Sequence, residues 1–439
     1  MRIFVVAAGY VGLTTASGFC ELGHEVTVHD LDPERVAMLS AGTSPILEAG
    51  MEDSIGAGLA AGRLRFTTSP EPPAGTDLAI ICVPTPADGT GLLDTSLVET
   101  VVQRLRRDLP AGATVVVRST LPLHGPDRLR AAAAGGPGPV VLVNPEFMRE
   151  GRALADFRTP SRIAVGYLQP DDRSAAEGFA ALYAPLNAPV LIADAESVCL
   201  LKLASNVFLA AKVAFANELA RLSDAIGADY VVVADGLGLD PRIGRAFLDA
   251  GPGFGGSCLP EQAEAIGIET SKRGIDAALM QAIAPSNRRH QEQIAQRLDD
   301  LLSGHLRGAR VALLGLAFKA GTNDVRRSPA LALAGLLRAA GAHVVAYDPV
   351  AAAPARLADP ELETAKSSED AVRDADAILI ATEWAEFANL DWANLARLMR
   401  GNLVVDTRRI VDADAARLAG LTYVGLGRAR ARDAELAVS

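Results

Sequence analysis

Lysine is scarce in this chain of 439 residues. Only five of its 42 basic residues are Lys, and the other 37 are Arg. An amine can shift its pKa and release a proton when it is desolvated, whereas a guanidinium cannot. A Lys kept in so Arg-rich a chain is therefore a candidate for chemistry that Arg would not serve.

Cysteine and long apolar runs are also sparse. The four cysteines (Cys20, Cys82, Cys199 and Cys258) show no metal-ligand spacing, which predicts no metal site, and free thiols suit a reducing compartment. No uninterrupted run of 18 apolar residues occurs, and no charged-then-apolar leader precedes the first strand. A net charge of −11 disfavours nucleic acid or an anionic membrane as the main partner. These absences predict a cytoplasmic protein that binds neither nucleic acid nor membrane.

The remaining pattern is that of a large α/β protein. A chain of 439 residues is long enough for two or three domains. Apolar strands alternate with helical stretches over residues 1–195, residues 196–301 show helical spacing, and a second set of strands and helices fills residues 302–439. The predicted strands are 2–6, 26–29, 79–83, 114–117, 140–143, 310–315, 344–349, 377–381 and 403–406. The predicted fold is two Rossmann-like doubly wound domains joined by a central helical segment.

A glycine-containing turn follows the first strand. The second strand ends at Asp30, 18 residues after Gly12. This strand–turn–helix–strand unit sets a pyrophosphate on a helix N-terminus and a ribose hydroxyl on a carboxylate. Gly9 stands where the backbone approaches phosphate and Gly12 where helix meets strand, but Ala7 replaces the expected first glycine. Asp30 favours NAD over NADP, and Arg35 weakens that preference slightly.

A second glycine-dense loop leads into a cysteine. Residues 251–256 contain four glycines, so a ligand could lie against bare backbone. Cys258 follows, just before a predicted helix start at Leu259, where a thiolate can be stabilised. A buried structural cysteine is the alternative for this motif taken alone. On another predicted helix, Lys202 and Asn206 are four residues apart and share a face.

Taken in order, the motifs resemble those of the UDP-glucose/GDP-mannose dehydrogenase family, nearly from end to end. The matching segments are 9–13, 83–86 (Val-Pro-Thr-Pro), 118–120 (Arg-Ser-Thr), 144–151 (Asn-Pro-Glu-Phe-Met-Arg-Glu-Gly), Lys202 with Asn206, 240–244, 251–258, 318–328 and 406–408. The resemblance implies NAD-dependent oxidation of a nucleotide-sugar C6 alcohol to the acid, with UDP-glucose to UDP-glucuronate favoured. It also implies an NAD-binding domain (1–195), a central domain with the catalytic Lys and Cys (196–301), a nucleotide-sugar-binding domain (302–439), and a homodimer or higher homo-oligomer.

The resemblance also implies catalytic roles. An aldehyde must add a nucleophile before it can give up a second hydride, so Cys258 would form a thiohemiacetal and then a thioester that water hydrolyses. Lys202 and Asn206 would steady the oxygen on which negative charge develops. Proton transfer or placement of a water falls to Thr120, Glu146 and Glu150.

The other implied roles are in binding. The cofactor residues are Gly9, Tyr10, Val11, Gly12, Asp30, Arg35, Thr85, Thr120, Glu150 and Arg326. The substrate residues are Phe147, Met148, Arg149, Lys202, Asn206, Arg242 (supplied by a neighbouring subunit), Phe247, Phe254, Gly255, Lys319 and Arg408. Among these, Arg149, Arg242, Lys319 and Arg408 are candidates for the nucleotide diphosphate.

Two positions after the cysteine depart from the family pattern. Where the family has Lys-Asp, this chain has Glu261 and Gln262. The family's Asp is thought to help deprotonate water or orient the thiol, and Gln262 cannot accept a proton. The alternative function is therefore an altered member that stalls at the thioester or only binds a nucleotide sugar. Leu259 resembles the GDP-mannose branch and the glycine loop the UDP-glucose branch, so base and sugar stay open.

Overall fold

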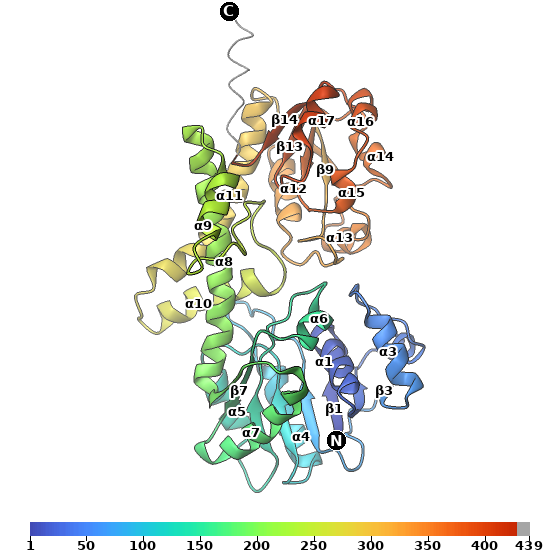
Figure 1. Cartoon of the computed structure of the whole chain (residues 1–439), viewed down its shortest axis with the longest axis vertical. Coiled ribbons are helices and arrows are strands. Elements are labelled where there is room, and N and C mark those ends of the chain that lie inside the picture. The colour runs from blue at the N-terminus through green and yellow to red at the C-terminus, as the bar shows by residue number, and fades with distance from the viewer. Residues whose placement is uncertain (428–439) are drawn as a thin grey trace, which may run out of the picture. The chain divides into compact units, whose positions relative to one another are not determined.

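The chain, described over residues 1–427 by a computed structural model, forms two compact units. The first is Met1–Ser205 and the second begins at Asn206, so the division falls inside helix α8 (Ala195–Ile226) (Figure 1). The predicted division into three domains at residues 195 and 301 stays a prediction.

The first unit is built on an eight-stranded sheet in the order β3-β2-β1-β4-β5-β6-β7-β8. The strands are β1 (Arg2–Val6), β2 (Glu25–His29), β3 (Leu64–Thr67), β4 (Leu78–Ile81), β5 (Thr114–Val117), β6 (Val140–Val143), β7 (Ile163–Tyr167) and β8 (Val190–Asp194). All neighbours are parallel except β6 and β7. The first six strands have the order of dinucleotide-binding folds, which confirms the predicted fold class for this half.

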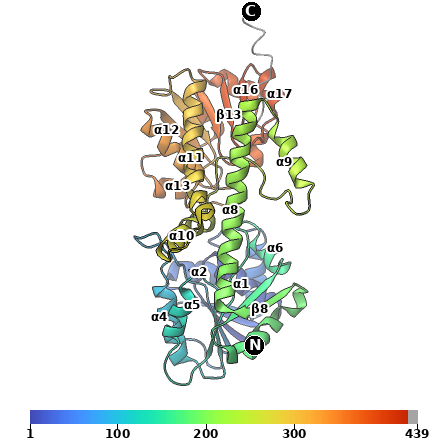
Figure 2. The same ribbon diagram turned by 90° about the vertical axis from the view of Figure 1, so that its left-hand side faces the viewer.

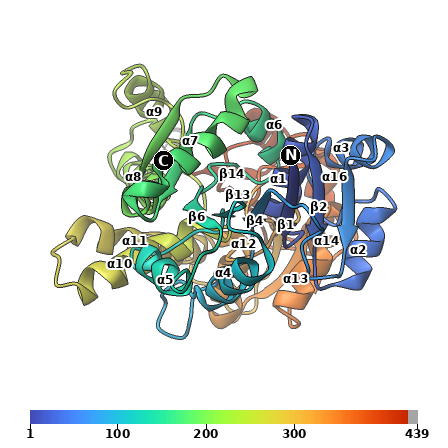
Figure 3. The same cartoon turned by 90° about the horizontal axis from the view of Figure 1, so that it is seen from below.

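Helices cover both faces of this sheet. One face carries α1 (Tyr10–Glu21), α2 (Pro33–Ser40), α3 (Met51–Ala60), α6 (Ala153–Arg158) and α7 (Arg173–Ala180), and the other carries α4 (Ser96–Asp108), α5 (Gly125–Ala132) and the start of α8. Figure 3 shows α4 and α5 on one side of the strands and α1 and α6 on the other. Alternate strand residues enter the two cores, Ile3 and Val5 in one and Phe4 and Val6 in the other. Strands buried on both faces are continuously apolar, which is why the sequence revealed most of them.

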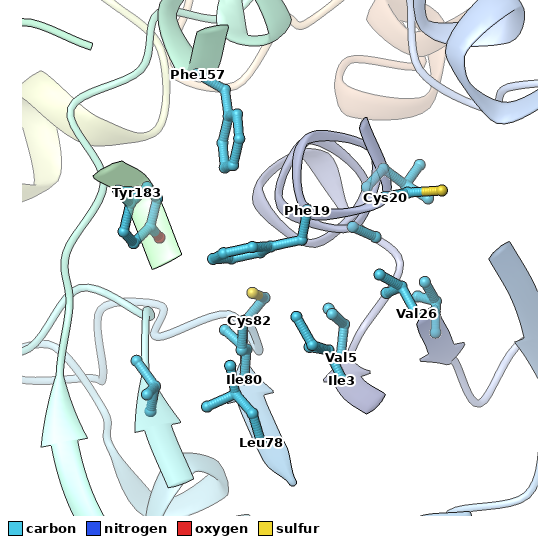
Figure 4. Packing of buried hydrophobic residues seen from close by; sticks show 14 of the residues in the cluster. Ile3, Val5, Phe19, Cys20, Val26, Leu78, Ile80, Cys82, Phe157 and Tyr183 are labelled. Atoms are coloured by element: carbon cyan, nitrogen blue, oxygen red, sulfur yellow. The ribbon is translucent and has the colours of Figure 1, made fainter. Parts of the chain in front are cut away.

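An aromatic cluster joins α1 to α6 in the first core. The ring of Phe19 lies 5.6 Å from that of Phe157 and 5.2 Å from that of Tyr183, measured between centroids (Figure 4). A Cβ on Gly18 would lie 2.1 Å from the Phe157 ring. This glycine is therefore required for α6 to pack against α1. Two 3₁₀ segments, η1 (Pro170–Asp172) and η2 (Ala181–Leu186), flank α7 and complete this face.

The second unit opens with helices. After α8 come α9 (Tyr230–Gly238), α10 (Cys258–Lys272) and α11 (Ala278–Leu301). Helices α8 and α11 run side by side in this unit (Figure 2), tied by hydrogen bonds that include Ser286 to Glu218 at 2.5 Å and Arg221 to His290 at 2.6 Å.

A six-stranded parallel sheet follows, in the order β11-β10-β9-β12-β13-β14. Its strands are β9 (Arg310–Leu314), β10 (His343–Tyr347), β11 (Glu363–Thr364), β12 (Ala377–Ile380), β13 (Leu403–Asp406) and β14 (Thr422–Gly425). Helices α11, α12 (Pro329–Ala339) and α13 (Ala352–Ala358) cover one face, and α14 (Ser368–Val372), α15 (Ala385–Ala388), α16 (Trp392–Leu398) and α17 (Ala413–Leu418) cover the other. The strand order repeats that of β3-β2-β1-β4-β5-β6 in the first unit, so the prediction of two doubly wound sheets with helices between them is confirmed.

Helix α8 corrects one sequence-based expectation. By length and composition it could cross a membrane, with a mean hydropathy of 1.7 over its most apolar window of 18 residues. Charged residues such as Lys202 and Lys212 interrupt α8, so it contains no continuous run of 18 apolar residues. The core helix of a soluble protein passes the same test, and α8 buries Val198 and Cys199 in the core of the first unit and Ala216 and Ala220 in that of the second.

Candidate active site

The turn after β1 is strained at its first residue. Ala7 has φ +82°, the left-handed region that favours glycine, and its N–H donates to the His29 carbonyl at 2.8 Å. A Cβ on Gly12 would lie 1.9 Å from the Ala7 carbonyl oxygen, so α1 begins as close to the strand as glycine allows. Nothing lies within 4 Å of the Cβ position of Gly9, which leaves the helix N-terminus open to an anion.

Asp30 directly follows β2 and lies beside this turn. Its side chain is buried, and it accepts hydrogen bonds from the Ala8 N–H at 2.7 Å and from Arg35 Nη1 at 3.2 and 3.3 Å. Burial raises the pKa of the Asp30 carboxyl, but the backbone hydrogen bonds and the charge of Arg35 outweigh it and lower the pKa. An ionised acceptor at this place and an open glycine turn fit the ribose and pyrophosphate of NAD.

Tyr10, the first residue of α1, ties the turn to a loop more than a hundred residues away. Its hydroxyl donates to the Glu48 carboxylate and accepts from the Gly151 N–H, while Glu48 also accepts from the Leu154 N–H at 3.2 Å. The next residue, Val11, packs against the core below. Sequence reasoning missed Glu48, since no motif surrounds it.

Two polar motifs meet at the carboxyl ends of β4 and β5. Thr85 Oγ1 donates to the Thr120 carbonyl at 2.9 Å, and Ser119 Oγ donates to the Val83 carbonyl at 2.6 Å. The predicted neighbours 83–86 and 118–120 are therefore brought together. They lie at the edge of the sheet where open α/β folds bind ligands.

A buried ion pair joins α8 to the loop after β6. Lys202 is 3% exposed, and its Nζ donates to Glu146 Oε1 at 2.8 Å and to the Glu146 carbonyl at 2.7 Å. Glu146 Oε2 accepts from the Met148 N–H at 2.6 Å. Burial raises the pKa of the Glu146 carboxyl, but the charge and hydrogen bond of Lys202 and the Met148 N–H lower it below its ordinary value. A buried ammonium group and a buried carboxylate therefore lie in direct contact.

The rest of this loop borders a cavity of about 340 Å³ within the first unit. Phe147 carries the guanidinium of Arg162 at 3.8 Å from its ring centroid, with Lys202 Nζ at 5.5 Å. Arg149 forms a bidentate ion pair with Asp156, with 2.9 Å from Nε to Oδ2 and 2.6 Å from Nη2 to Oδ1. Arg149 therefore already has a carboxylate partner, while Glu150 next to it is partly exposed.

In the second unit, Cys258 is the first residue of α10, one position earlier than predicted. It is the only cysteine of the four that is not buried. Its Sγ lies 3.6 Å from Ser257 Oγ. Burial raises the pKa of the Cys82 and Cys199 thiols to about 12, which leaves them unreactive. The position of Cys258 at a helix N-terminus suits a thiolate.

Polar side chains of α8 and α11 hold the glycine loop before the cysteine. The Gly251 N–H donates to Asn217 Oδ1 at 2.8 Å, and its carbonyl oxygen lies 2.7 Å from His290 Nε2. Asn287 accepts from the Phe254 N–H at 2.9 Å and donates to the Phe254 carbonyl at 3.0 Å. Sequence reasoning named Phe254 but none of the three side chains that fix the loop.

The glycines of this loop are needed for packing. A Cβ on Gly255 would lie 2.5 Å from Pro329 Cδ and 2.8 Å from the Arg327 carbonyl oxygen. The Gly256 N–H donates to the Arg326 carbonyl at 3.2 Å. The loop thus lies directly on the segment 318–329 of its own unit, and the assignment of Gly255 to substrate binding stays a prediction.

Glu261 and Gln262, the two residues that differ from the family pattern, have different partners, and Asn206 is the partner of one of them. Asn206 Nδ2 donates to Gln262 Oε1 at 2.9 Å, and Gln262 is 3% exposed. Glu261 instead faces Arg327, with 3.9 Å between Oε1 and Nε. Burial raises the pKa of the Glu261 carboxyl, and the charge of Arg327 offsets part of that rise.

The predicted phosphate ligands of the second sheet lie beside Phe318. Lys319 Nζ is 5.5 Å from the Phe318 ring centroid. Arg408 donates to the Phe318 carbonyl at 3.1 Å and to the Ala381 carbonyl at 2.9 Å, and its Nε is 3.1 Å from a Glu383 oxygen. The Arg408 guanidinium is therefore oriented by the protein before any ligand arrives.

Three further residues were predicted to bind cofactor or substrate. The Arg242 side chain is 87% exposed and pairs with Asp240 at 2.6 Å. Arg326 pairs in the same way with Asp324 at 2.5 Å. Phe247 has φ +66°, a strained conformation for a bulky residue.

Family comparisons agree with this geometry. Models of the UDP-glucose/GDP-mannose dehydrogenase family match residues 1–187 (NAD binding domain), 196–289 (central domain) and 312–413 (UDP binding domain). The chain belongs to this family. Among family members, the UDP-glucose 6-dehydrogenase of Rhizobium meliloti is 37% identical over 98% of this chain and 100% of its own length. The UDP-glucose 6-dehydrogenase AglM of Haloferax volcanii is 40% identical over 97% of this chain and 100% of its own.

Solved structures of the family show the same fold. A UDP-glucose dehydrogenase from Pyrobaculum islandicum superposes with a TM-score of 0.88 at 37% identity, covering 98% of both chains. A UDP-D-ManNAc dehydrogenase from Pyrococcus horikoshii gives a TM-score of 0.85 at 28% identity, covering 98% of this chain and 100% of that one. The family resemblance stated from the motifs is confirmed, as is the NAD-binding character of the first sheet.

Proposed function

We propose that this protein is an NAD-dependent UDP-glucose dehydrogenase, which oxidises the C6 alcohol of UDP-glucose to the carboxylate of UDP-glucuronate by two successive oxidations. Curated relatives of that name match at 37% and 40% identity over nearly the whole chain. The observation that carries the proposal is Cys258, which is the one cysteine left accessible and stands at the N-terminus of α10.

Cys258 would take part in the reaction by forming and then breaking a bond between its sulfur and the sugar carbon. NAD, when bound, supplies the acceptor for both hydrides. Cys258 Sγ would form a bond to the aldehyde carbon left by the first oxidation. The second oxidation would leave a thioester, and water would break its carbon–sulfur bond to release the acid and the thiolate.

Lys202 and Glu146 would hold charge and a proton near the reacting oxygen. The ammonium group of Lys202 is buried against the Glu146 carboxylate, so each ion satisfies the other in a site poor in water. An oxygen that becomes negative during the reaction would draw on the Lys202 proton. Asn206 would offer the N–H of its amide that Gln262 does not take, and Thr120 and Glu150 would position a water.

The binding roles rest on groups already oriented. Gly9, Gly12 and Asp30 would hold the cofactor, with Tyr10, Val11, Arg35, Thr85 and Arg326 around it. Arg408 is fixed by two carbonyl groups, which suits a bidentate contact with a diphosphate. Lys319, Arg149 and the backbone of Phe147, Met148 and Phe254 would complete the substrate site.

We infer that the enzyme is a homodimer or a larger homo-oligomer. Phe208, Phe215, Leu222 and Ile226 lie along α8 and are 67%, 52%, 53% and 70% exposed. The first three are seven residues apart, so they form one apolar stripe on the helix. A second copy of the chain would cover this stripe, and the 87% exposed side chain of Arg242 could then reach the partner's substrate. Light scattering of Phe208→Ser with Phe215→Ser would detect a smaller assembly.

We also place the enzyme in the cytoplasm, where a reactive free thiol stays reduced. The decisive test of function is purified protein with NAD and a panel of UDP-glucose, GDP-mannose and UDP-N-acetylhexosamines. We expect UDP-glucose to be preferred and two NADH to appear for each sugar consumed. One NADH per sugar would indicate release of the aldehyde, and binding without NADH would support the non-catalytic alternative.

A further inference from the structure

Glu48 is a buried carboxylate that no motif marks. It lies shortly before α3 and is 8% exposed. A carboxylate that water does not solvate needs hydrogen-bond donors from the protein. In the described part of the chain, the side chain of Glu48 has two donors: the Tyr10 hydroxyl on Oε2 and the Leu154 N–H, at 3.2 Å, on Oε1. Each of its oxygens therefore holds a different segment of the first unit.

The Tyr10 hydroxyl extends this contact to a third segment, because it also bonds to the Gly151 N–H. A phenol hydroxyl has one proton to donate and oxygen lone pairs with which it accepts. The Gly151 N–H can only donate, so the hydroxyl accepts there and gives its own proton to Glu48. Glu48 is thus the acceptor that turns the hydroxyl oxygen toward Gly151.

Gly151 ends the loop that carries Glu150. On the other side of Glu150, the Arg149 N–H donates to Asp156 Oδ2 at 2.9 Å. The Gly151 N–H is held by Tyr10. The main chain is therefore fixed immediately before and immediately after Glu150, once by α6 and once by the first residue of α1.

Glu48 contributes to both of these attachments. Through Tyr10 it holds the Gly151 side, and through the Leu154 N–H it holds the first turn of α6, the helix from which Asp156 reaches Arg149. Tyr10 directly follows Gly9, where the helix N-terminus is open to the cofactor's pyrophosphate. The loop that carries Glu150 thus lies one tyrosine side chain away from the predicted cofactor site.

We propose that Glu48 is a positioning residue that acts through Tyr10: it orients the Tyr10 hydroxyl, which holds Glu150 in place for the reaction. The proposal rests on the proposed function, in which Glu150 positions a water. Such a group must stand within hydrogen-bond reach of its target, and a displacement of about 1 Å can cost about 10²-fold in rate. The proposed diphosphate ligands Lys319 and Arg408 belong to the second unit and make no contact with Glu48. Loss of the Glu48 acceptor should therefore lower kcat and leave sugar binding intact.

The near-isosteric change Glu48→Gln tests this role. An amide that still accepts from the Leu154 N–H presents its NH2 group to Tyr10, so the hydroxyl loses the acceptor for its proton. An amide turned the other way faces the Leu154 N–H with a second donor. Either orientation breaks one attachment. We expect kcat to fall about tenfold or more, with the KM for UDP-glucose within about threefold of the parent.

Hydrogen exchange gives a readout that needs no ligand. In protein without NAD, the amides of residues 149–154 should exchange with deuterium about tenfold faster in Glu48→Gln than in the parent, as measured by mass spectrometry of peptides. Glu52→Gln is the matched control. Glu52 lies on α3, is exposed and accepts from the Ser44 N–H at 3.1 Å, so its replacement removes the same charge nearby. That control should leave both kcat and exchange unchanged.

A double-mutant cycle tests whether Glu48 acts through Tyr10. Tyr10→Phe removes only the hydroxyl and should lower kcat about as much as Glu48→Gln does. If the two residues act as one unit, adding Glu48→Gln to Tyr10→Phe lowers kcat by no more than about a further twofold. Two independent tenfold effects would instead multiply to about a hundredfold.

Three results would overturn the proposal: unchanged exchange in Glu48→Gln, faster exchange with the parent's kcat, or a hundredfold loss in the double variant. If Glu48→Gln does not fold, Tyr10→Phe decides alone, and a kcat equal to that of the parent refutes the role. A parent protein without turnover would refute the proposed function instead. Exchange is measured without nucleotide sugar or NAD, so the two failures are distinguishable.

Discussion

Replacing Ala7 by glycine should stabilise the first unit. Ala7 is held at φ +82° from both sides, since its N–H is bonded to the His29 carbonyl and its own carbonyl abuts Gly12. The chain cannot rotate out of this conformation without moving α1 off the sheet. The Cβ of Ala7 therefore sits in a region that L-residues avoid, whether or not a ligand is bound.

Two opposing terms set the magnitude. A non-glycine residue in the left-handed region costs about 1–2 kcal/mol. Glycine at the same place lowers the stability by about 0.5–1 kcal/mol, because it gives the unfolded chain more conformational freedom. The net gain for Ala7→Gly is about 0.5–1 kcal/mol. In a unit of this size, 1 kcal/mol moves Tm by about 2–4 °C, so we expect a rise of about 1–4 °C.

Calorimetry of Ala7→Gly beside Ala8→Gly measures the effect. Ala8 is the neighbouring residue, is 1% exposed and has no positive φ, so its replacement by glycine adds unfolded-state freedom and removes a buried methyl group, and both effects should lower Tm. Opposite signs for the two variants are expected. If Ala7→Gly lowers Tm as Ala8→Gly does, the strain at residue 7 is not real.

Three other outcomes follow from the site. Cys258→Ser should abolish acid formation and leave the nucleotide-sugar Kd within a few-fold, as measured by NADH release and calorimetry; undiminished acid formation would refute the nucleophile. Asp30 should make NAD preferred to NADP by at least about tenfold, or about 1.4 kcal/mol, and equal kcat/KM for both would contradict this. Burial lowers the pKa of His290 to about 4. Because unfolded His takes its proton near pH 6.5, stability present above that pH should be lost as the pH falls toward 4. His290→Asn should flatten that part of the urea-unfolding profile.

The fold was predictable because its strands are buried on both faces. Runs such as 79–83 and 115–117 are apolar throughout and have no competing helical period. Two of the missed strands, β8 and β11, lacked this signal. β8 is largely exposed at the edge of its sheet, and β11 has only two residues, so local sequence carries little information about either. Their positions are set by pairing with neighbours, which sequence patterns do not report.

The candidate site was predictable only where motifs are continuous. Glu48 bonds to Tyr10 across 38 residues, and no local pattern links them. Two of the side chains that hold the glycine loop, Asn287 and His290, left a weak signal in the sequence, because with Gln291 they recur on one buried face of helix α11. A polar stripe at such spacing, among buried neighbours, indicates side chains that bond to another segment. This polar stripe does not indicate which segment its side chains bond to.

Glu261 and Gln262 show what helix geometry adds to a motif. In the sequence, the acid at 261 looks able to substitute for one missing at 262, because the two are adjacent. Successive helical residues point about 100° apart, however, and the structure sends Glu261 to Arg327 and Gln262 to Asn206. Only position 262 inherits the place of the family's acid, and an amide there whose oxygen is already committed can only donate. The departure therefore places a neutral amide, bonded to Asn206, where the family pattern has an acid.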